Sequence, residues 1–120
     1  MSYQKFRAKK TIVDDIVFAS KLEAARYIKL KALEKAGEIC DLVLQPEFQI
    51  AHGYVDPKTG KKVKSVFYVA DFEYVDIKTH LKIVEDTKGD ETDVFKLKWK
   101  LVQPLYRDRE FRKLKDKDVW

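Results

Sequence analysis

An acid and a lysine in the third quarter of the chain have the types and spacing that metal-assisted chemistry on a phosphate needs. Asp86 and Lys88 stand two residues apart in LKIVEDTKG, whose apolar and β-branched residues predict a strand. Side chains alternate between the two faces of a strand, so Asp86 and Lys88 are expected on one face and Glu85 on the other. Buried strands normally exclude charged residues, so this pair indicates a site.

A second acid is expected beside the first. The preceding predicted strand, SVFYVADFEY, carries Asp71 directly after the apolar run 66–70, and the loop Asp76–His80 would join the two strands as a hairpin. Carboxylate oxygens are the ligands that Mg²⁺ and Mn²⁺ prefer, and such a bound metal activates water for hydrolysis. Asp71 and Asp86 therefore form a candidate site for a hard divalent cation.

Glu23 is a third candidate acid, on a helix predicted over Ser20–Ala36. Ser20 and Glu23 have the spacing of a capping box, and Gly37 is a typical helix terminator. Glu23 also shares a helical stripe with Tyr27, which turns it toward apolar surroundings. Either Glu23 only caps its own helix, which the local sequence favours, or its carboxylate points toward the acids on the sheet.

The remaining pattern predicts an α/β (α+β) domain in which helices pack on a mainly antiparallel or mixed sheet. A second helix is expected over Asp93–Gln103, between Thr92 as its cap and Pro104. The expected strands are Thr11–Val13 and Ile16–Phe18 as an N-terminal β-hairpin, then Ile39–Leu44, Phe48–His52, Val63–Val75, His80–Lys88 and Glu110–Leu114.

The length of the chain limits the number of domains, and its net charge favours certain classes of partner. The chain has 120 residues, which suits one domain over 1–120, and its net charge is +5 with a pI of about 9.2. This charge favours an anionic partner, nucleic acid before a membrane surface, although a basic protein can also have no such partner. Residues 1–10 form a basic arm, and 107–120 are expected to be a charged, solvated tail.

Four lysines outside the acidic pattern are candidate phosphate contacts. Lys9 and Lys10 belong to the basic arm, and Lys61 and Lys62 follow a turn with strong Asp-Pro-Gly chemistry. Solvated positions are the simpler interpretation of all four. The single cysteine excludes an intramolecular disulfide and fits a reducing, cytoplasmic setting, and no apolar stretch is long enough to span a bilayer.

The order of elements and the acids resemble the PD-(D/E)xK nuclease superfamily, whose core runs helix, three strands, helix, strand. Here VAD ending at Asp71 would be the first half of its motif, with alanine in place of proline, and DTK from Asp86 to Lys88 the second. FASKLEAARY, LVLQPEF, YVADFEY and VEDTKGDET also resemble a small phage and prophage family of unknown function placed in that superfamily. The similarity covers about residues 5–106.

The resemblance implies a restriction-endonuclease-like core, a mixed central sheet flanked by two helices, and a Mg²⁺- or Mn²⁺-dependent DNA endonuclease. Asp71 and Asp86 would hold the metal with the Thr87 carbonyl, and Glu23 would bind it through water or complete a second site. Lys88 would orient or deprotonate the attacking water, or stabilise the transition state. The further residues implied to contact nucleic acid are Lys98 on the second helix, with Lys61, Lys62, Lys9 and Lys10.

Small phage members of this superfamily include Holliday junction resolvases, so branched DNA is the implied substrate, in the host cytoplasm if the protein is phage-encoded. A single site cuts one strand, and symmetric cutting of a junction would need a C₂ homodimer. The alternative is a non-catalytic nucleic-acid-binding or phage assembly protein that retains the nuclease fold. A purely structural domain with solvated acids is a third interpretation.

Overall fold

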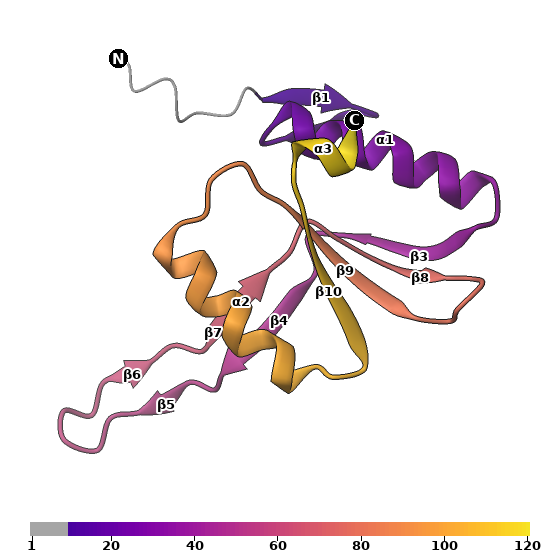
Figure 1. Ribbon diagram of the computed structural model, residues 1–120. Helices are drawn as coiled ribbons and strands as arrows, with labels where there is room; N and C mark the ends of the chain where they lie inside the picture. Colours follow the sequence, from indigo (N-terminus) through magenta and orange to yellow (C-terminus); the bar gives the residue numbers. More distant parts are fainter. Residues whose placement is uncertain (1–9) are drawn as a thin grey trace, which may run out of the picture.

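The computed structural model describes residues 10–120, and Figure 1 shows a mixed α/β fold. Lys9 and most of the predicted basic arm lie outside the described residues. The helices are α1 (Lys21–Lys35), α2 (Asp93–Leu105) and α3 (Asp116–Val119). The strands are β1 (Thr11–Val13), β2 (Ile16–Phe18), β3 (Ile39–Leu44), β4 (Glu47–Ala51), β5 (Tyr54–Val55), β6 (Lys62–Val63), β7 (Val66–Val69), β8 (Phe72–Asp76), β9 (Lys82–Thr87) and β10 (Arg109–Leu114).

The central sheet has the order β10-β9-β8-β3 and is mixed, as predicted. Strands β3, β8 and β9 pair antiparallel, and β10 pairs parallel to β9. The predicted β8–β9 hairpin is confirmed, with Tyr74 opposite Ile83 and Phe72 opposite Glu85. Opposed residues lie on one face of a sheet, so these four side chains point the same way.

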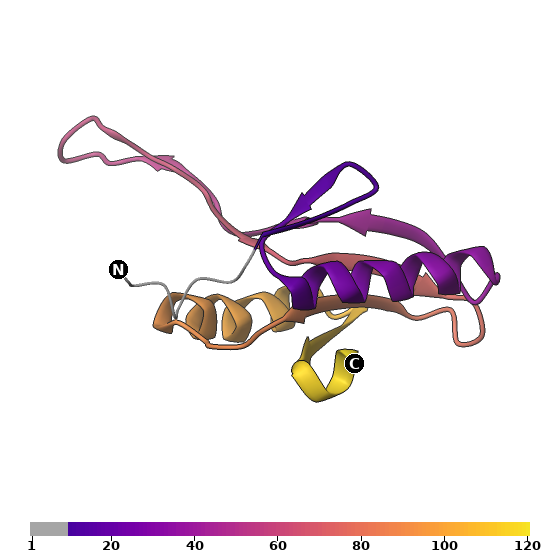
Figure 2. The same cartoon turned by 90° about the horizontal axis from the view of Figure 1, so that it is seen from above.

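Two hydrophobic clusters cover the two faces of β9. Ile83 packs in a cluster with α1 residues such as Tyr27 and Leu30, whereas Val84 packs with Phe95 of α2. Neighbouring strand residues point to opposite faces, so α1 lies on one side of the sheet and α2 on the other, together with the β4–β7 ribbon. Figure 2 shows α1 running along the sheet.

The predictions for the start of the chain are confirmed. Ser20 is the N-cap of α1, with its Oγ accepting a hydrogen bond from the N–H of Glu23 at 3.0 Å, and Gly37 ends the helix region at φ +78°. The β1–β2 hairpin turns at Asp14 and Asp15, which both have left-handed φ values, 53° and 63°. Aspartate tolerates this conformation better than most residues, so the turn forms without the usual glycine.

The predicted long strand Val63–Val75 is wrong. The chain forms β6, β7 and β8 in succession, because β7 pairs with β4 in a separate ribbon and β8 enters the central sheet. The change of partner falls at Ala70 and Asp71, between β7 and β8. Asp71 therefore lies where the ribbon crosses onto the sheet. Helix α2 also continues through Pro104 to Leu105, two residues past the expected end at Gln103.

The segment 107–120 is not a solvated tail. The strand predicted over Glu110–Leu114 is confirmed as β10, which pairs with β9, and Val119 of α3 is buried. Phe111 packs against the cluster that contains Phe95, while the charged residues around it face outward. The many charges conceal this period-two pattern in the sequence. Within residues 10–120 no helix is long and apolar enough to cross a membrane.

Candidate functional site

Asp86 is one of two almost fully buried acids on β9. It lies near the end of β9 and is only 1% exposed. Its Oδ2 accepts a short hydrogen bond from the hydroxyl of Tyr68 on β7. Its Oδ1 is buried and has no hydrogen-bond partner among the described residues, although the Nζ of Lys88 lies 3.4 Å away as an ion pair. A buried carboxylate oxygen without a hydrogen bond is energetically costly, so this atom is suited to a further ligand.

Asp71 is fixed against the same end of β9. Its N–H donates to the carbonyl of Glu85 at 3.1 Å, and its Oδ2 accepts from the N–H and the hydroxyl of Thr87 at 2.7 and 2.8 Å. These bonds hold the Asp71 carboxylate beside the strand that carries Asp86. Burial, followed by the charge of Asp71, raises the pKa of Asp86 to about 7. The charge of Asp71 therefore acts directly on the carboxyl group of Asp86.

Glu23 joins this acidic cluster from α1. Its N–H completes the cap on Ser20, while its side chain is buried at 7% exposure. Burial raises the pKa of Glu23 to about 7, and the charges of Asp71 and Asp86 add to the effect. The cap uses only the backbone N–H of Glu23, and the charges of Asp71 and Asp86 act on its buried carboxylate.

Lys88 brings a positive charge to the edge of the cluster. Its ammonium pairs with Asp86 and lies 4.5 Å from the ring centre of Phe95, at the start of α2. Its N–H donates to the carbonyl of Leu114 on β10 at 2.9 Å, which fixes the backbone just after β9. The side chain keeps 30% exposure, so it can reach a ligand that approaches from solvent.

Glu85 lies on the face of β9 opposite Asp86, and both of its carboxylate oxygens accept hydrogen bonds. It is 0% exposed and accepts two hydrogen bonds from the guanidinium of Arg26 on α1, at 2.7 and 2.6 Å. The hydroxyl of Tyr74 donates a third, short hydrogen bond to it. Asp86 is thus the acid available beside Asp71, and Glu85 ties α1 to β9 one helical turn from Glu23.

Arg26, Tyr68 and Tyr74 are residues that the sequence analysis missed. Each carries a polar group into a buried position to satisfy a carboxylate on β9. Tyr68 stands in an apolar run and Arg26 on a helix of mixed charge, so neither stands out in the sequence. The sequence indicates these residues only through their spacing. Tyr68 is two residues from Ala70 and so shares its strand face, and Arg26 is three residues from Glu23 and so lies near it on the helix.

The predicted nucleic-acid contacts are spread more widely. Lys61 and Lys62 are exposed on the β5–β6 hairpin, Lys10 is exposed at the start of the described chain, and Lys9 lies outside it. Lys98 is half-buried on α2, and no ion pair joins it to the acids in the described part of the molecule. The sheet therefore gathers the acids and Lys88, whereas these lysines belong to other surfaces.

The acidic cluster suits a hard divalent cation by its donor set. Among residues 10–120 no three Asp, Glu, His or Cys side chains are already gathered as a metal cage. Asp86 nevertheless offers a buried oxygen that lacks a hydrogen bond, beside the carboxylates of Asp71 and Glu23. Converging carboxylates repel one another, and a divalent cation bound to their oxygens would relieve that repulsion. Carboxylate oxygens are the donors that Mg²⁺ and Mn²⁺ prefer.

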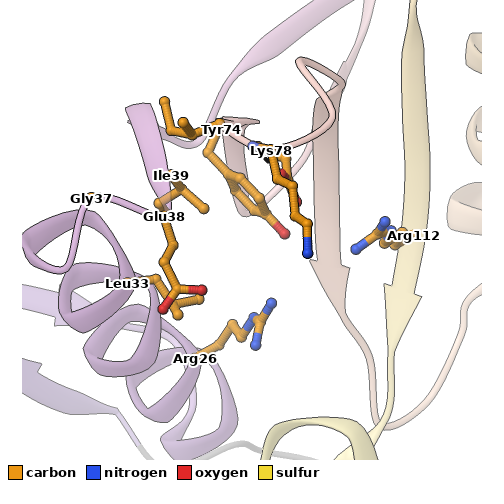
Figure 3. A pocket seen from close by; sticks show the side chains of 10 residues that line it. Arg26, Leu33, Gly37, Glu38, Ile39, Tyr74, Lys78 and Arg112 are labelled. Carbon is orange, nitrogen blue, oxygen red and sulfur yellow. Dashed lines mark hydrogen bonds between the residues drawn. The ribbon is translucent and has the colours of Figure 1, made fainter.

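A separate cavity of about 430 Å³ lies beside α1 and contains none of the acidic cluster. Figure 3 shows Arg26, Lys78 and Arg112 pointing toward the hydroxyl of Tyr74. Two acids also line the cavity, and both arginines are already paired with carboxylates. Its charges are therefore nearly balanced, and the Arg26–Glu85–Tyr74 contacts form part of its wall.

Comparison with known proteins gives one match. A family model described as "Protein of unknown function (DUF1064)" matches residues 3–117. No curated protein and no solved structure matches the chain. The matched range contains the acidic cluster, Lys88 and all strands of the central sheet.

Proposed function

The chain belongs to the DUF1064 family, and we propose that it is a metal-dependent endonuclease that hydrolyses DNA phosphodiester bonds. The observation that carries the proposal is the buried Oδ1 of Asp86, which has no hydrogen bond in the described chain and faces the ammonium of Lys88. A binding-only protein has no use for carboxylates turned toward a phosphate. The order α1, then β3, β8 and β9, then α2 and β10, supports a PD-(D/E)xK-like core.

The acidic side chains would bind the metal, and the lysine would contact the reacting groups. Asp71 and Asp86 would hold Mg²⁺ or Mn²⁺, with the Thr87 carbonyl and Glu23 as further oxygen donors. When bound, the metal supplies an acidified water and neutralises charge that develops on the phosphate. Thr87 also keeps Asp71 in place through its N–H and hydroxyl. Tyr68 holds one oxygen of Asp86 and leaves the other available.

Lys88 would act on the reacting groups. An ammonium donates hydrogen bonds and accepts none, so its Nζ would orient the attacking water or bind a non-bridging phosphate oxygen. The ring of Phe95 and the pairing with Asp86 restrict where the ammonium can lie. Fixed donors of this kind favour the transition state because little reorganisation is needed during the reaction.

We expect the metal-free protein to be less stable at pH 8 than at pH 5. The folded-state pKa values of Glu23 and Asp86 are both raised to about 7, so the folded state binds more protons than the unfolded state between about pH 4 and pH 7. The free energy of unfolding therefore falls as pH rises through that window. Mg²⁺ should restore it at pH 8, by about 2.7 kcal/mol at a concentration of 100 Kd.

Urea unfolding in EDTA or Mg²⁺ at both pH values measures this effect. The Asp86→Asn variant should lose the Mg²⁺ response and part of the pH difference, because asparagine neither titrates nor offers a charged ligand. Asp15→Asn is the matched control, since Asp15 is exposed in the β1–β2 turn and asparagine tolerates its left-handed φ. A full Mg²⁺ response in Asp86→Asn would place the metal elsewhere.

A further inference from the structure

A two-stranded hairpin projects from the body of the molecule, at the end of the β4–β7 ribbon that is remote from Asp71 in the chain. The β4–β7 ribbon continues into β5–β6, and Figures 1 and 2 show this extension standing away from the sheet and the helices. We call residues 52–65 the arm, which is a different segment from the basic residues 1–10. At its base a Cβ on Gly53 would lie 2.8 Å from the carbonyl oxygen of Val63 and 3.0 Å from the nitrogen of Ser65, so the two chains cross as closely as glycine allows.

The arm has a defined shape although it packs against little else. At its tip the N–H of Asp56 donates to the carbonyl of Lys61 at 2.8 Å, and the N–H of Gly60 donates to the carbonyl of Asp56 at 2.7 Å. The Asp56 side chain accepts a further hydrogen bond from the N–H of Lys58 at 2.8 Å. These bonds order the tip before any partner is present, which lowers the entropic cost of binding.

The surface of the arm is basic and partly apolar. Its exposed cations are Lys58, Lys61, Lys62 and Lys64, and its only acid is Asp56. Tyr54 is 61% exposed, and Val55 and Val63 also face solvent. Tyr54 stands opposite Val63 and Val55 opposite Lys62, so both faces of the ribbon combine apolar and basic groups. Neither the core nor the acidic cluster accounts for these side chains.

We propose that the arm lies in a groove of duplex DNA and holds the strand to be cut beside Asp71 and Asp86. The major groove admits a two-stranded β-ribbon, and its walls are two rows of phosphates. Lysines on both faces of the ribbon would meet both rows, while Tyr54 and the valines would contact base edges and thymine methyl groups. This proposal deepens the proposed function and rests on it for the identity of the substrate.

The arm and the acidic cluster are joined by one strand. The Tyr68 hydroxyl of β7 donates a hydrogen bond to Asp86, and the arm ends three residues before Tyr68, at Ser65. Lys61 precedes Asp71 by ten residues of extended chain, so it can lie at most about 35 Å from the acids. One turn of a B-form duplex is about 34 Å. A single duplex is therefore long enough to contact both the arm and the cluster.

The test is equilibrium binding of the full chain to a linear 30-base-pair duplex by fluorescence anisotropy, in EDTA so that no cleavage occurs. We expect Lys61→Ala/Lys62→Ala to weaken binding by about tenfold to hundredfold at 100 mM salt, and to reduce the slope of log K against log salt by about 2. The matched control is Lys29→Ala/Lys35→Ala, which removes the same charge from two exposed positions of α1. The control should change affinity only slightly.

Equal loss of affinity in the two double variants would overturn the proposal, and so would the absence of duplex binding by the unmodified protein. Tyr54→Ser/Val63→Ser tests the rival occupant, a second copy of the chain. If that variant converts a dimer to a monomer with unchanged duplex affinity, the arm is a self-association surface and the proposal fails. Binding is measured in EDTA and cleavage in Mg²⁺, so the two proposals can fail separately. Arm-dependent binding without cleavage would contradict the endonuclease proposal and support DNA binding by the arm.

Discussion

Lys88→Met should lower the single-turnover rate of metal-dependent DNA cleavage by about 10²- to 10³-fold, the range expected when one positioned hydrogen-bond donor is lost. Methionine keeps an unbranched stem against the Phe95 ring and removes the ammonium that lies 3.4 Å from Asp86. The fold should survive, because the Lys88 side chain is partly exposed and its backbone bond to Leu114 is unaffected.

Binding of Mn²⁺ separates this chemical role from a ligand role. Lys88→Met should bind Mn²⁺ at least as tightly as the unmodified protein, because a neighbouring positive charge has been removed. Lys82→Met is the matched control, since Lys82 is exposed at the other end of β9 and its variant should cleave at the normal rate. A Lys88→Met rate within tenfold of the unmodified rate would show that the ammonium takes no part in the reaction.

Arg26→Met should lower the free energy of unfolding by about 3–5 kcal/mol, the usual effect of removing one partner of a buried ion pair. Glu85 is completely buried and receives two of its three hydrogen bonds from Arg26. The variant would leave that carboxylate with only the hydroxyl of Tyr74. Urea unfolding at pH 7 measures the loss.

Two further variants test whether the unpaired charge of Glu85 causes the loss of stability in Arg26→Met. Arg26→Met/Glu85→Gln should recover much of the lost stability, because glutamine removes the buried charge and still accepts from Tyr74. Lys31→Met breaks the exposed Lys31–Glu34 pair on the same helix and should change the free energy of unfolding by less than about 1 kcal/mol. Equal effects of Arg26→Met and Lys31→Met would mean that the buried pair contributes little.

The elements that local chemistry determines could be predicted from the sequence. Ser20 and Gly37 define α1, and alternation defines β9, so the shared face of Asp86 and Lys88 followed directly. The division of Val63–Val75 could not be predicted, because it depends on β7 pairing with β4 rather than with β9. The strand at Glu110–Leu114 could be predicted, but its parallel pairing with β9 could not, because most side chains of β10 are charged and do not mark a buried strand.

The site shows the same limit. The sequence predicted Asp71 and Asp86 on adjacent strands, whereas Asp71 lies between β7 and β8. It could not show which groups satisfy Glu85 and Asp86, which are both almost fully buried. That choice depends on Arg26 and Tyr68, which come from a helix and a ribbon far away in the sequence. Side-chain partners across elements are set by tertiary packing, which period and spacing do not encode.

Direct incubation with DNA tests the central claim. The unmodified protein is mixed with a four-way junction, a flap, a linear duplex, single-stranded DNA and RNA, each in Mg²⁺, Mn²⁺ or EDTA, with Asp71→Ala and Lys88→Ala alongside. The net charge of +5 favours binding through the phosphate backbone and the shape of the DNA. We expect metal-dependent cutting of DNA, fastest on the branched substrates, and its loss in EDTA and in both variants. Binding without cleavage in either metal would contradict the endonuclease and indicate a non-catalytic nucleic-acid-binding protein.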